Sequence, residues 1–288
     1  MTPFRPSYRE DATGFLRAWN HCGSMSGGSS YDAAADHAFP DERLNEVLEF
    51  IDSDEEVQTY LDAQNVNPVA RMRYNDHGAK HVSIVRDKAL TLYELLYADG
   101  VEFNGAVDQG LEPADEPVVV ALAATLHDIG HVVHRDEHPY YSIPLAADLL
   151  DRILPEFYGT ADAVRVKGEV LHAILCHHTE ETPLTTEAGI VRLADGLDME
   201  RGRSRYPYES GGRGINTVSS QAIEKVTLST GDGAAVLVEI EMHNAAGVYQ
   251  VDELLKAKLR GSGLEEHVRI IAVNTTDGGD NIVERIEL

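Results

Sequence analysis

Apolar residues recur with the period of an α-helix in one segment after another from residue 41 to about residue 205. A period of about 3.6 residues places such residues on one face of a helix, whereas a strand needs a period of two. Because these patterns all have the helical period, the range is predicted to form an all-α core. Helices are expected in two stretches between 41 and 61, in the segment that carries His81, where Asn75 or Asp76 is the expected N-cap, and over about 118–129, 141–154, 164–178 and 188–199.

The pattern changes after residue 205. The segment 206–214, Tyr-Pro-Tyr-Glu-Ser-Gly-Gly-Arg-Gly, is predicted to be a linker. β-Branched residues then alternate on both sides of Gly231-Asp232-Gly233, which is a strong hairpin signal. A helix with apolar residues between 251 and 259 and strands near 268–273 and 282–286 follow. The predicted fold class is therefore mainly α, with an all-helical core over 41–205 followed by a small α+β unit, β-β-α-β-β, over 215–288.

The first 40 residues show no sustained period and contain prolines and a run of glycines and serines, so we expect a loosely held N-terminal extension. The chain has 288 residues, of which 43% are hydrophobic, enough for a core domain and a smaller unit. No run approaches the roughly 18 apolar residues that a membrane span needs, and the N-terminus lacks a signal-peptide pattern. We expect a cytoplasmic protein with no membrane partner.

The formal net charge is −25, and the acidic residues are spread along the chain, which has only six lysines. At molar salt the Debye length falls to about 3 Å, so self-repulsion on such a surface becomes tolerable. The composition therefore predicts a protein adapted to a high-salt cytosol, from a halophilic archaeon, with an ordinary acidic protein as the alternative. In either case the charge argues only weakly against nucleic-acid binding.

The adjacent pair His127-Asp128 lies in the run Ala-Thr-Leu-His-Asp-Ile-Gly-His, at the end of an apolar stretch that begins near Val118. An imidazole and a carboxylate side by side at the end of a buried helix offer mixed nitrogen and oxygen ligands for a divalent metal. His81 lies upstream in Asn-Asp-His-Gly-Ala-Lys-His-Val, and Asp195 lies downstream in Arg-Leu-Ala-Asp-Gly-Leu-Asp. Each of these two residues is in a helical pattern of its own.

The order His, His-Asp, Asp on three separate helices resembles the HD-domain superfamily of metal-dependent phosphohydrolases. The resemblance spans roughly residues 70–205 and implies that His81, His127, Asp128 and Asp195 hold a divalent metal ion. A bound divalent ion lowers the pKa of its water from about 15.7 towards about 7 and polarises a phosphoryl oxygen. The resemblance thus implies hydrolysis of a phosphoester by metal-activated water, with Asp128 and His131 as catalytic residues and Mn, Co, Ni, Mg, Zn or Fe as the ion.

The residue three positions after Asp128 is His131, where many members of the family carry lysine or glutamate. A histidine there is able to donate to a phosphate oxygen or to serve as acid or base, since its ordinary pKa is about 6.5. It is equally able to act as a third imidazole ligand, or to be a helix-terminal histidine favoured by the dipole. These roles remain open at this point.

Further histidines raise the question of a second metal. Relatives with additional histidines between the His-Asp pair and the last aspartate bind two metals, and His138 matches the first additional position. His177 and His178 compete for the second position; His172 and His177 are about 140° apart on a helical wheel, so they cannot both face one ion. We predict that His138 and His177 hold the second ion. The alternative is one metal per chain, with these histidines buried and hydrogen-bonded.

Arg201, Arg203 and Arg205 alternate just beyond the predicted end of the last core helix. A guanidinium group presents a bidentate fork to phosphate, so three closely spaced arginines in an acidic chain are candidates for a phosphate clamp. The alternative is a set of salt bridges to neighbouring acids. The C-terminal unit offers little chemistry by sequence and is expected to pack on the core, to form a homo-oligomer or to shape the substrate entrance.

The favoured hypothesis is a phosphohydrolase that acts on a nucleotide or a related small phosphorylated molecule. The chain has no phosphate-binding Gly-x-x-x-x-Gly-Lys loop, no strand-borne Gly-x-Gly-x-x-Gly and no Gly-x-Ser-x-Gly elbow. One alternative is a regulatory module in which the centre senses a nucleotide and the C-terminal unit transmits the signal. Another is a di-iron oxygenase, because a few proteins of this fold hold two irons; the native metal distinguishes it from a hydrolase.

Overall fold

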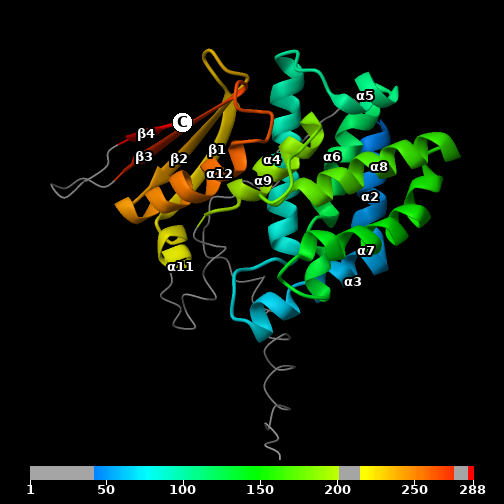
Figure 1. The fold of residues 1–288 in the computed structure, drawn as a ribbon, viewed down its shortest axis with the longest axis horizontal. Helices are drawn as coiled ribbons and strands as arrows, with labels where there is room; N and C mark the ends of the chain where they lie inside the picture. Colours follow the sequence, from blue (N-terminus) through cyan, green and yellow to red (C-terminus); the bar gives the residue numbers. More distant parts are fainter. Residues whose placement is uncertain (1–41, 201–214, 276–284) are drawn as a thin grey trace, which may run out of the picture. The chain divides into compact units, whose positions relative to one another are not determined.

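The computed structural model describes residues 42–200, 215–275 and 285–288 (Figure 1). The predicted N-terminal extension, the predicted linker 206–214 and the three arginines at 201–205 lie outside the described residues. All described residues belong to one compact unit of the chain, Asp36–Leu288. No helix among them is both long enough and apolar enough to cross a bilayer.

The helical part is built around α6 (Glu116–Leu126), whose residues are all buried. Its Pro-Val-Val-Val-Ala-Leu-Ala-Ala sequence has no polar face, and a helix of that kind is stable only when neighbours cover it on every side. The helices α2, α4, α8 and α9 pack against it. The core helices are α2 (Glu42–Ser53), α3 (Glu55–Ala63), α4 (Ala79–Ala98), α5 (Asn104–Gln109), α6, α7 (His138–Ile153), α8 (Thr160–Cys176) and α9 (Thr186–Leu197).

Several helix ends differ from the sequence-based expectation. The helix that carries His81 begins at Ala79 with Gly78 at its N-cap, and neither Asn75 nor Asp76 occupies that position. The Asp76 carboxylate instead accepts hydrogen bonds from the Gly78 backbone at 2.7 Å and from the Asn65 side chain at 2.9 Å, so it stabilises the loop before the helix. The helix expected to reach residue 129 ends at Leu126, and a 3₁₀ turn, Ile129–Val132, follows the His-Asp pair.

Short irregular segments complete the core. They are the π-helical turn Val66–Arg71 and the 3₁₀ turns Pro113–Asp115, Ile129–Val132 and Leu154–Glu156. Gly130 allows the turn after the His-Asp pair to approach α7 closely, because a Cβ on it would lie 2.1 Å from the His138 carbonyl oxygen and 2.6 Å from the Ser142 nitrogen. The first turn of α7, with His138, is thereby held next to His127 and Asp128.

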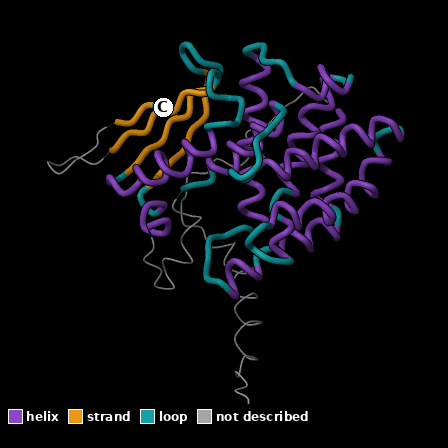
Figure 2. Tube along the Cα trace, viewed as in Figure 1, coloured by secondary structure: helices purple, strands orange, loops and turns teal. Residues whose placement is uncertain are grey.

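The C-terminal part confirms the predicted order of two strands, a helix and two strands. β1 (Ile223–Thr230) and β2 (Val236–Met242) form the expected antiparallel hairpin, β3 (Val268–Asn274) pairs parallel to β2, and β4 (Arg285–Glu287) pairs antiparallel to β3 (Figure 2). The connection from β2 to β3 contains the 3₁₀ turn Ala245–Gly247, the π-helical turn Gln250–Leu255 and α12 (Lys256–Leu259). A further short helix, α11 (Ile215–Ser220), precedes β1.

The sheet and α12 pack against two core helices. Lys88 of α4 donates to the Val226 carbonyl of β1 at 3.4 Å, and α12 packs against α9. Arg192 of α9 is buried and donates to three carbonyls at the end of α12, those of Ala257, Lys258 and Arg260, at 3.0–3.2 Å. These bonds place α12 beside the part of α9 that carries Asp195.

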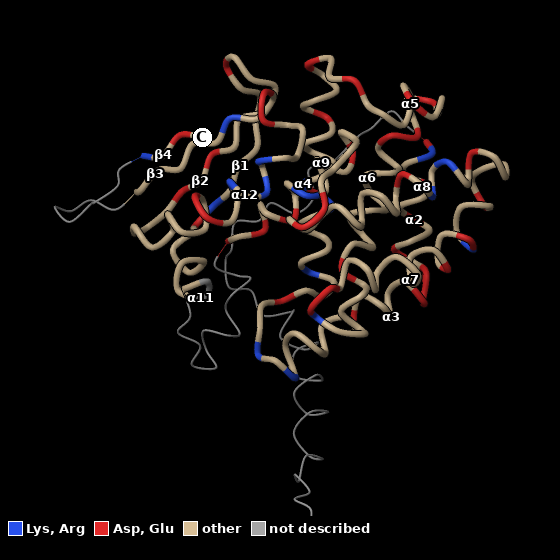
Figure 3. The backbone as a smooth tube through the Cα atoms, in the orientation of Figure 1, with Lys and Arg blue, Asp and Glu red and all other residues tan. Residues whose placement is uncertain are grey.

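Acidic residues are distributed along the helices and the sheet, as the sequence predicted, and basic residues are fewer (Figure 3). The main exception to this exposed distribution is a set of buried carboxylates. Two of them, Asp115 and Glu116, lie at the start of α6, and others lie close to the candidate site. Buried charge therefore occurs both at the candidate site and at the start of α6.

Candidate metal centre

Residues from five helices and the turns between them converge in one buried cluster. His81 is in the first turn of α4, Asp195 is in the last turn of α9, and His138 is the first residue of α7. His127 and His177 follow the ends of α6 and α8, Asp128 and His131 belong to the turn after α6, and His77 precedes α4. The cluster, called the His/Asp cluster below, consists of His77, His81, His127, Asp128, His131, His138, His177 and Asp195.

Asp128 is the centre of this cluster, and its two carboxylate oxygens face different sets of imidazoles. Oδ2 lies 2.8 Å from His77 Nδ1, 3.3 Å from His81 Nε2 and 3.4 Å from His127 Nε2. Oδ1 lies 3.5, 3.1 and 3.7 Å from the Nε2 atoms of three further histidines, which are His131, His138 and His177. A carboxylate with donor atoms on both sides has the geometry of a bridging ligand.

The Oδ2 side has the dimensions of a metal site. The Nε2 atoms of His81 and His127 are 3.2 Å apart, and Asp195 Oδ1 lies 3.4 Å from the first and 3.9 Å from the second. Ligands at about 2.1 Å from a common ion are about 3.0 Å apart at an octahedral angle and about 3.4 Å apart at a tetrahedral angle. These three atoms, together with Asp128 Oδ2, therefore make four donors that fit around one ion. His81, His127 and Asp195 are one of three groups in the described residues whose spacing could hold a metal.

The Oδ1 side has a similar geometry. His138 Nε2 and His177 Nε2 are 3.0 Å apart, and both approach Asp128 Oδ1. The ring of His131 is stacked on that of His138, with the centroids 4.1 Å apart and the planes at 15°. His127, Asp128 and His177 form another of the groups with metal-ligand spacing, and His77, Asp128 and His131 form the third.

The protonation pattern of four histidines supports a cation between them. Each uses Nδ1 to donate to a protein oxygen at 2.6–2.9 Å: His81 to Asp198 Oδ2, His127 to the Ala124 carbonyl, His138 to the Arg135 carbonyl and His177 to the Ile174 carbonyl. In a neutral imidazole only one nitrogen carries a proton, so Nε2 of each ring is a bare acceptor. Two pairs of such acceptors stand 3.0 and 3.2 Å apart, and acceptors facing each other need a cation between them. This donation from the far nitrogen is the usual support for a metal-binding histidine.

At three residues of the cluster, burial and neighbouring charge shift the pKa in the direction that metal binding requires. Burial alone would raise the pKa of Asp128, but the imidazoles around it, His127 and His131 foremost, hold the pKa of this carboxyl well below its usual range. Burial, with His127 and His138 close by, lowers the pKa of His177 well below its ordinary value. Burial likewise lowers the pKa of His131. An ionised carboxylate and neutral imidazoles are the forms that coordinate metals.

His131 differs from the four supported histidines. Its side chain is 1% exposed, its Nε2 lies 3.5 Å from Asp128 Oδ1, and neither ring nitrogen has a hydrogen-bond partner among the described residues. A metal-bound histidine normally has an acceptor for its second nitrogen. The structure therefore places His131 at the Oδ1 side but without the support that the ligands share.

The structure brings together all seven residues predicted for the two metal positions and for catalysis. His172 and His178 make other contacts: His172 Nε2 accepts from the Leu184 backbone at 3.0 Å, and His178 pairs with Glu180 at 2.6 Å, with its ring centroid 5.6 Å from that of His138. The predicted phosphate clamp at 201–205 lies outside the described residues.

Sequence reasoning missed three residues at the cluster. His77 lies 2.8 Å from Asp128 Oδ2, but it precedes α4 and therefore lies on no helical face that a sequence pattern could reveal. Asp198 supports His81, and it is three residues after Asp195, on the same helical face. Lys258, from the C-terminal part, pairs with the Asp195 carboxylate, and no sequence pattern indicated it.

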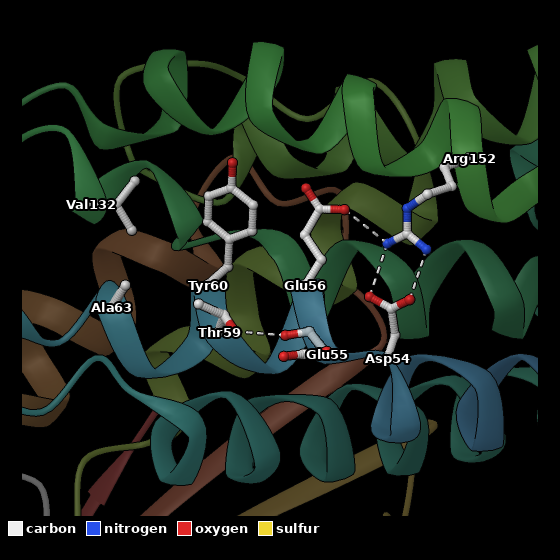
Figure 4. Close-up of a pocket in the computed structure, with 8 residues that line it drawn as sticks. All are labelled: Asp54, Glu55, Glu56, Thr59, Tyr60, Ala63, Val132 and Arg152. Atoms are coloured by element: carbon white, nitrogen blue, oxygen red, sulfur yellow. Dashed lines mark hydrogen bonds and ion pairs between the residues drawn. The ribbon is translucent and has the colours of Figure 1, made fainter.

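A surface groove lies elsewhere on the core (Figure 4). Residues of α3, Arg152 of α7 and Val132 line it, and Arg152 holds Asp54 in a two-bond ion pair at 2.7 and 2.8 Å. Val132 follows His131 in the chain, but no residue of the His/Asp cluster lines the groove. Arg152 is paired with both Asp54 and Glu56 of the groove, so we assign the chemistry to the cluster and not to the groove.

Comparison with known proteins gives a consistent result. Residues 100–200 match the HD domain family. The uncharacterized protein MJ1020 of Methanocaldococcus jannaschii is 39% identical over 216 residues, which are 75% of this chain and 83% of that protein. Ribonuclease Y of Desulforudis audaxviator is 29% identical over 170 residues, 57% of this chain and 30% of that enzyme, and ribonuclease Y of Thermoanaerobacter pseudethanolicus is 35% identical over 91 residues, 31% and 15%. The chain thus matches less than a third of either ribonuclease. No solved structure is significantly similar.

Proposed function

The chain belongs to the HD domain family, and from this premise we propose that it is a metal-dependent phosphohydrolase that cleaves a phosphoester of a nucleotide or a related small molecule. The observation that carries the proposal is the two-sided environment of Asp128, where unprotonated Nε2 atoms face both carboxylate oxygens. HD domains bind divalent metals, and the donor set and spacing of the cluster fit such ions.

In this proposal His81, His127, Asp195 and Oδ2 of Asp128 hold the first ion. Oδ1 of Asp128, His138 and His177 hold the second. Imidazole-rich donor sets suit Zn, Fe and Ni, while carboxylates also suit Mn and Mg, so the mixed set favours a transition metal. A divalent ion in such a site lowers the pKa of a water molecule and polarises a phosphoryl oxygen.

We assign proton transfer to His131. Its lack of a supporting acceptor distinguishes it from the four histidines assigned as ligands. Burial keeps its imidazole neutral at neutral pH, so Nε2 is able to accept a proton from the attacking water near Asp128. The ionised Asp128 carboxylate would orient this proton transfer, because it lies between the Oδ1 and Oδ2 sides of the cluster.

The similarity to ribonuclease Y adds a phosphodiester to the substrate classes worth testing. Those relatives are named as ribonucleases, but the match covers a minor part of each. A net charge of −25 repels nucleic acid at low salt, and that repulsion weakens as salt screens it. A short RNA therefore belongs in the same screen as mononucleotides, and both belong at high and low salt.

The test is a measurement of metal content and turnover on the same preparation. The full chain is purified without added metal, its bound metals are quantified, and nucleotides, cyclic nucleotides and short RNA are screened with Mn²⁺, Co²⁺, Ni²⁺, Mg²⁺, Zn²⁺ and Fe²⁺. Asp128→Ala is expected to lose both bound metal and turnover, whereas Asp62→Ala, an exposed aspartate of α3, retains them. A wild-type protein that holds metal but hydrolyses no phosphoester under any of these conditions would refute the enzymatic proposal.

The same preparation tests the alternatives. A cluster with six imidazoles around one bridging carboxylate is also compatible with two irons, so native iron with O₂-dependent substrate oxidation would favour an oxygenase. A nucleotide held tightly without product would favour a regulatory module. We also propose a boundary between the helical domain and the C-terminal unit near residues 205–215, which limited proteolysis would test. A homo-oligomeric state is a separate proposal, which light scattering would test.

A further inference from the structure

We propose that Lys258, from the C-terminal unit, is a positioning residue of the His/Asp cluster. It holds the Asp195 carboxylate so that Oδ1 faces His81 and His127. The C-terminal unit is then a required part of the metal centre and not an accessory to it. This inference rests on the proposed function, because it assumes that Asp195 is a metal ligand.

Lys258 contacts both sides of the cluster. Its ammonium group forms an ion pair with Asp195 Oδ2 and donates to the His177 carbonyl at 3.0 Å. The side chains of Lys258 and Asp195 are 15% and 12% exposed, so the pair is largely shielded from solvent. Asp195 belongs to the Oδ2 side of the cluster and His177 to the Oδ1 side. Lys258 therefore bonds to two chain segments, one from each side.

The neighbouring residues make room for this lysine. Gly196 follows Asp195, and a Cβ at that position would lie 3.0 Å from Lys258 Cδ and 3.3 Å from Leu255 Cδ1. Such distances are shorter than ordinary van der Waals contact between carbon atoms. A side chain at 196 would push the lysine stem away from Asp195, so the glycine is what permits the approach.

The helix that carries Lys258 is fixed on α9. Arg192, one turn before Asp195, donates to the Lys258, Ala257 and Arg260 carbonyls. The last four backbone carbonyls of a helix have no hydrogen-bond partner within the helix, so they need one from elsewhere. Since a buried guanidinium supplies it from the same helix that bears Asp195, the backbone of Lys258 cannot shift without breaking these bonds. The ammonium group is thus delivered to a defined place.

The physical effect of Lys258 is to hold the Asp195 carboxylate in one orientation about its Cβ–Cγ bond. A carboxylate with one oxygen held in an ion pair is restricted in its rotation about the Cβ–Cγ bond. With Oδ2 held by Lys258, Oδ1 is the oxygen presented to the Nε2 atoms of His81 and His127, 3.4 and 3.9 Å away. Loss of a residue that orients a metal ligand typically costs 10- to 100-fold in metal affinity, so this is about the change expected here.

The experiment compares Co²⁺ binding by the full-length chain and three variants, followed by equilibrium titration and by the visible absorption of the bound ion. K258M removes the ammonium group and keeps much of the stem. K258R restores a cation. K256M is the matched control. Lys256 is on the same helix, but its ammonium group pairs with Asp252, 2.6 Å away, and not with a residue of the cluster. K258M is expected to bind Co²⁺ about 10- to 100-fold more weakly with an altered spectrum, K258R to recover much of the affinity, and K256M to match the wild type.

The outcomes separate this inference from the proposed function. If the wild type binds no Co²⁺, the metal site fails and the role of Lys258 fails with it. If the wild type binds Co²⁺ and K258M binds with the same affinity and spectrum, the role of Lys258 alone is overturned. Should K258M not fold, K258A replaces it, because alanine likewise has no group that donates to Asp195, and an unchanged affinity in that variant overturns the inference equally.

Discussion

Replacing Asp128 by alanine is expected to abolish binding at both metal positions, whereas replacing His177 is expected to abolish only one. The difference follows from the geometry, because Oδ2 of Asp128 faces His81 and His127 while Oδ1 faces His138 and His177. A carboxylate that bridges two ions is a ligand of both. His177 contributes its Nε2 to the Oδ1 side only.

The magnitude follows from linkage between binding and folding. An ion that binds the folded chain alone adds about 2.7 kcal/mol to the free energy of unfolding when its free concentration is 100 times its Kd. Two independent sites add about 5.4 kcal/mol. For a chain of this size each kcal/mol raises Tm by about 2–4 °C, so the wild type is expected to gain roughly 10–20 °C from metal. His177→Ala should gain about half of that, and Asp128→Ala none.

The assay is thermal unfolding of each variant with chelator and with excess metal, together with the number of metal ions bound per chain. Each variant serves as its own reference, so a change in the stability of the metal-free protein does not enter the comparison. Asp62→Ala is the control and should keep the full gain. A gain in Asp128→Ala equal to that of His177→Ala, with one ion still bound, would show that Asp128 serves a single site and would refute the bridging geometry.

Three further results are expected. Burial, with Glu187 nearby, raises the pKa of Glu116 from 4.5 to about 7, so the free energy of unfolding falls as pH rises through that interval. E116Q should remove this pH dependence. In denaturant titrations above pH 7 it should raise the free energy of unfolding by on the order of 3 kcal/mol. Gly130→Ala should lower Tm and weaken metal binding, because its Cβ would overlap the His138 carbonyl, whereas Gly168→Ala in α8, where a Cβ meets nothing within 4 Å, should stabilise by about 0.5–1 kcal/mol. A rise from 0.1 to 2 M KCl should raise Tm, since it screens a net charge of −25; an unchanged or lower Tm would argue against adaptation to high salt.

The helices could be predicted because periodicity fixes which face of a helix is buried. The fully apolar run of α6 had to be central, and His127 and Asp128 at its end therefore had to be inside. His81 and Asp195 were identified in a different way, from the order His, His-Asp, Asp that resembles the HD-domain superfamily. The hairpin followed from the glycines at 231 and 233, and the structure gives Gly233 a φ of 81°, which favours glycine.

His77 could not be placed in the same way, because it precedes α4 and belongs to no helical face. Its position depends on hydrogen bonds from a distant turn: its backbone nitrogen donates to Asn65 Oδ1 at 2.9 Å, and the Gln64 side chain donates to its carbonyl oxygen. These bonds turn the loop so that Nδ1 reaches Asp128. Periodicity describes faces of regular elements, and a residue held by side-chain bonds within a loop has no period to reveal it.

Under the proposed function, the charge of the metal-loaded cluster would let so acidic a chain bind a phosphorylated ligand. Asp128, Asp195 and Asp198 are the carboxylates at the cluster, and Lys258 offsets one of them. Two divalent ions would exceed the charge of the three carboxylates even without the lysine, so the loaded cluster is a local cation within an anionic protein. Because the cluster is shielded from solvent, this local charge is screened less than the surface charge. An anionic phosphoester would therefore be repelled by the surface and attracted once it reaches the metal-loaded cluster, and salt weakens mainly the repulsion. We therefore predict that added salt raises the association rate of the phosphoester and changes its dissociation rate less.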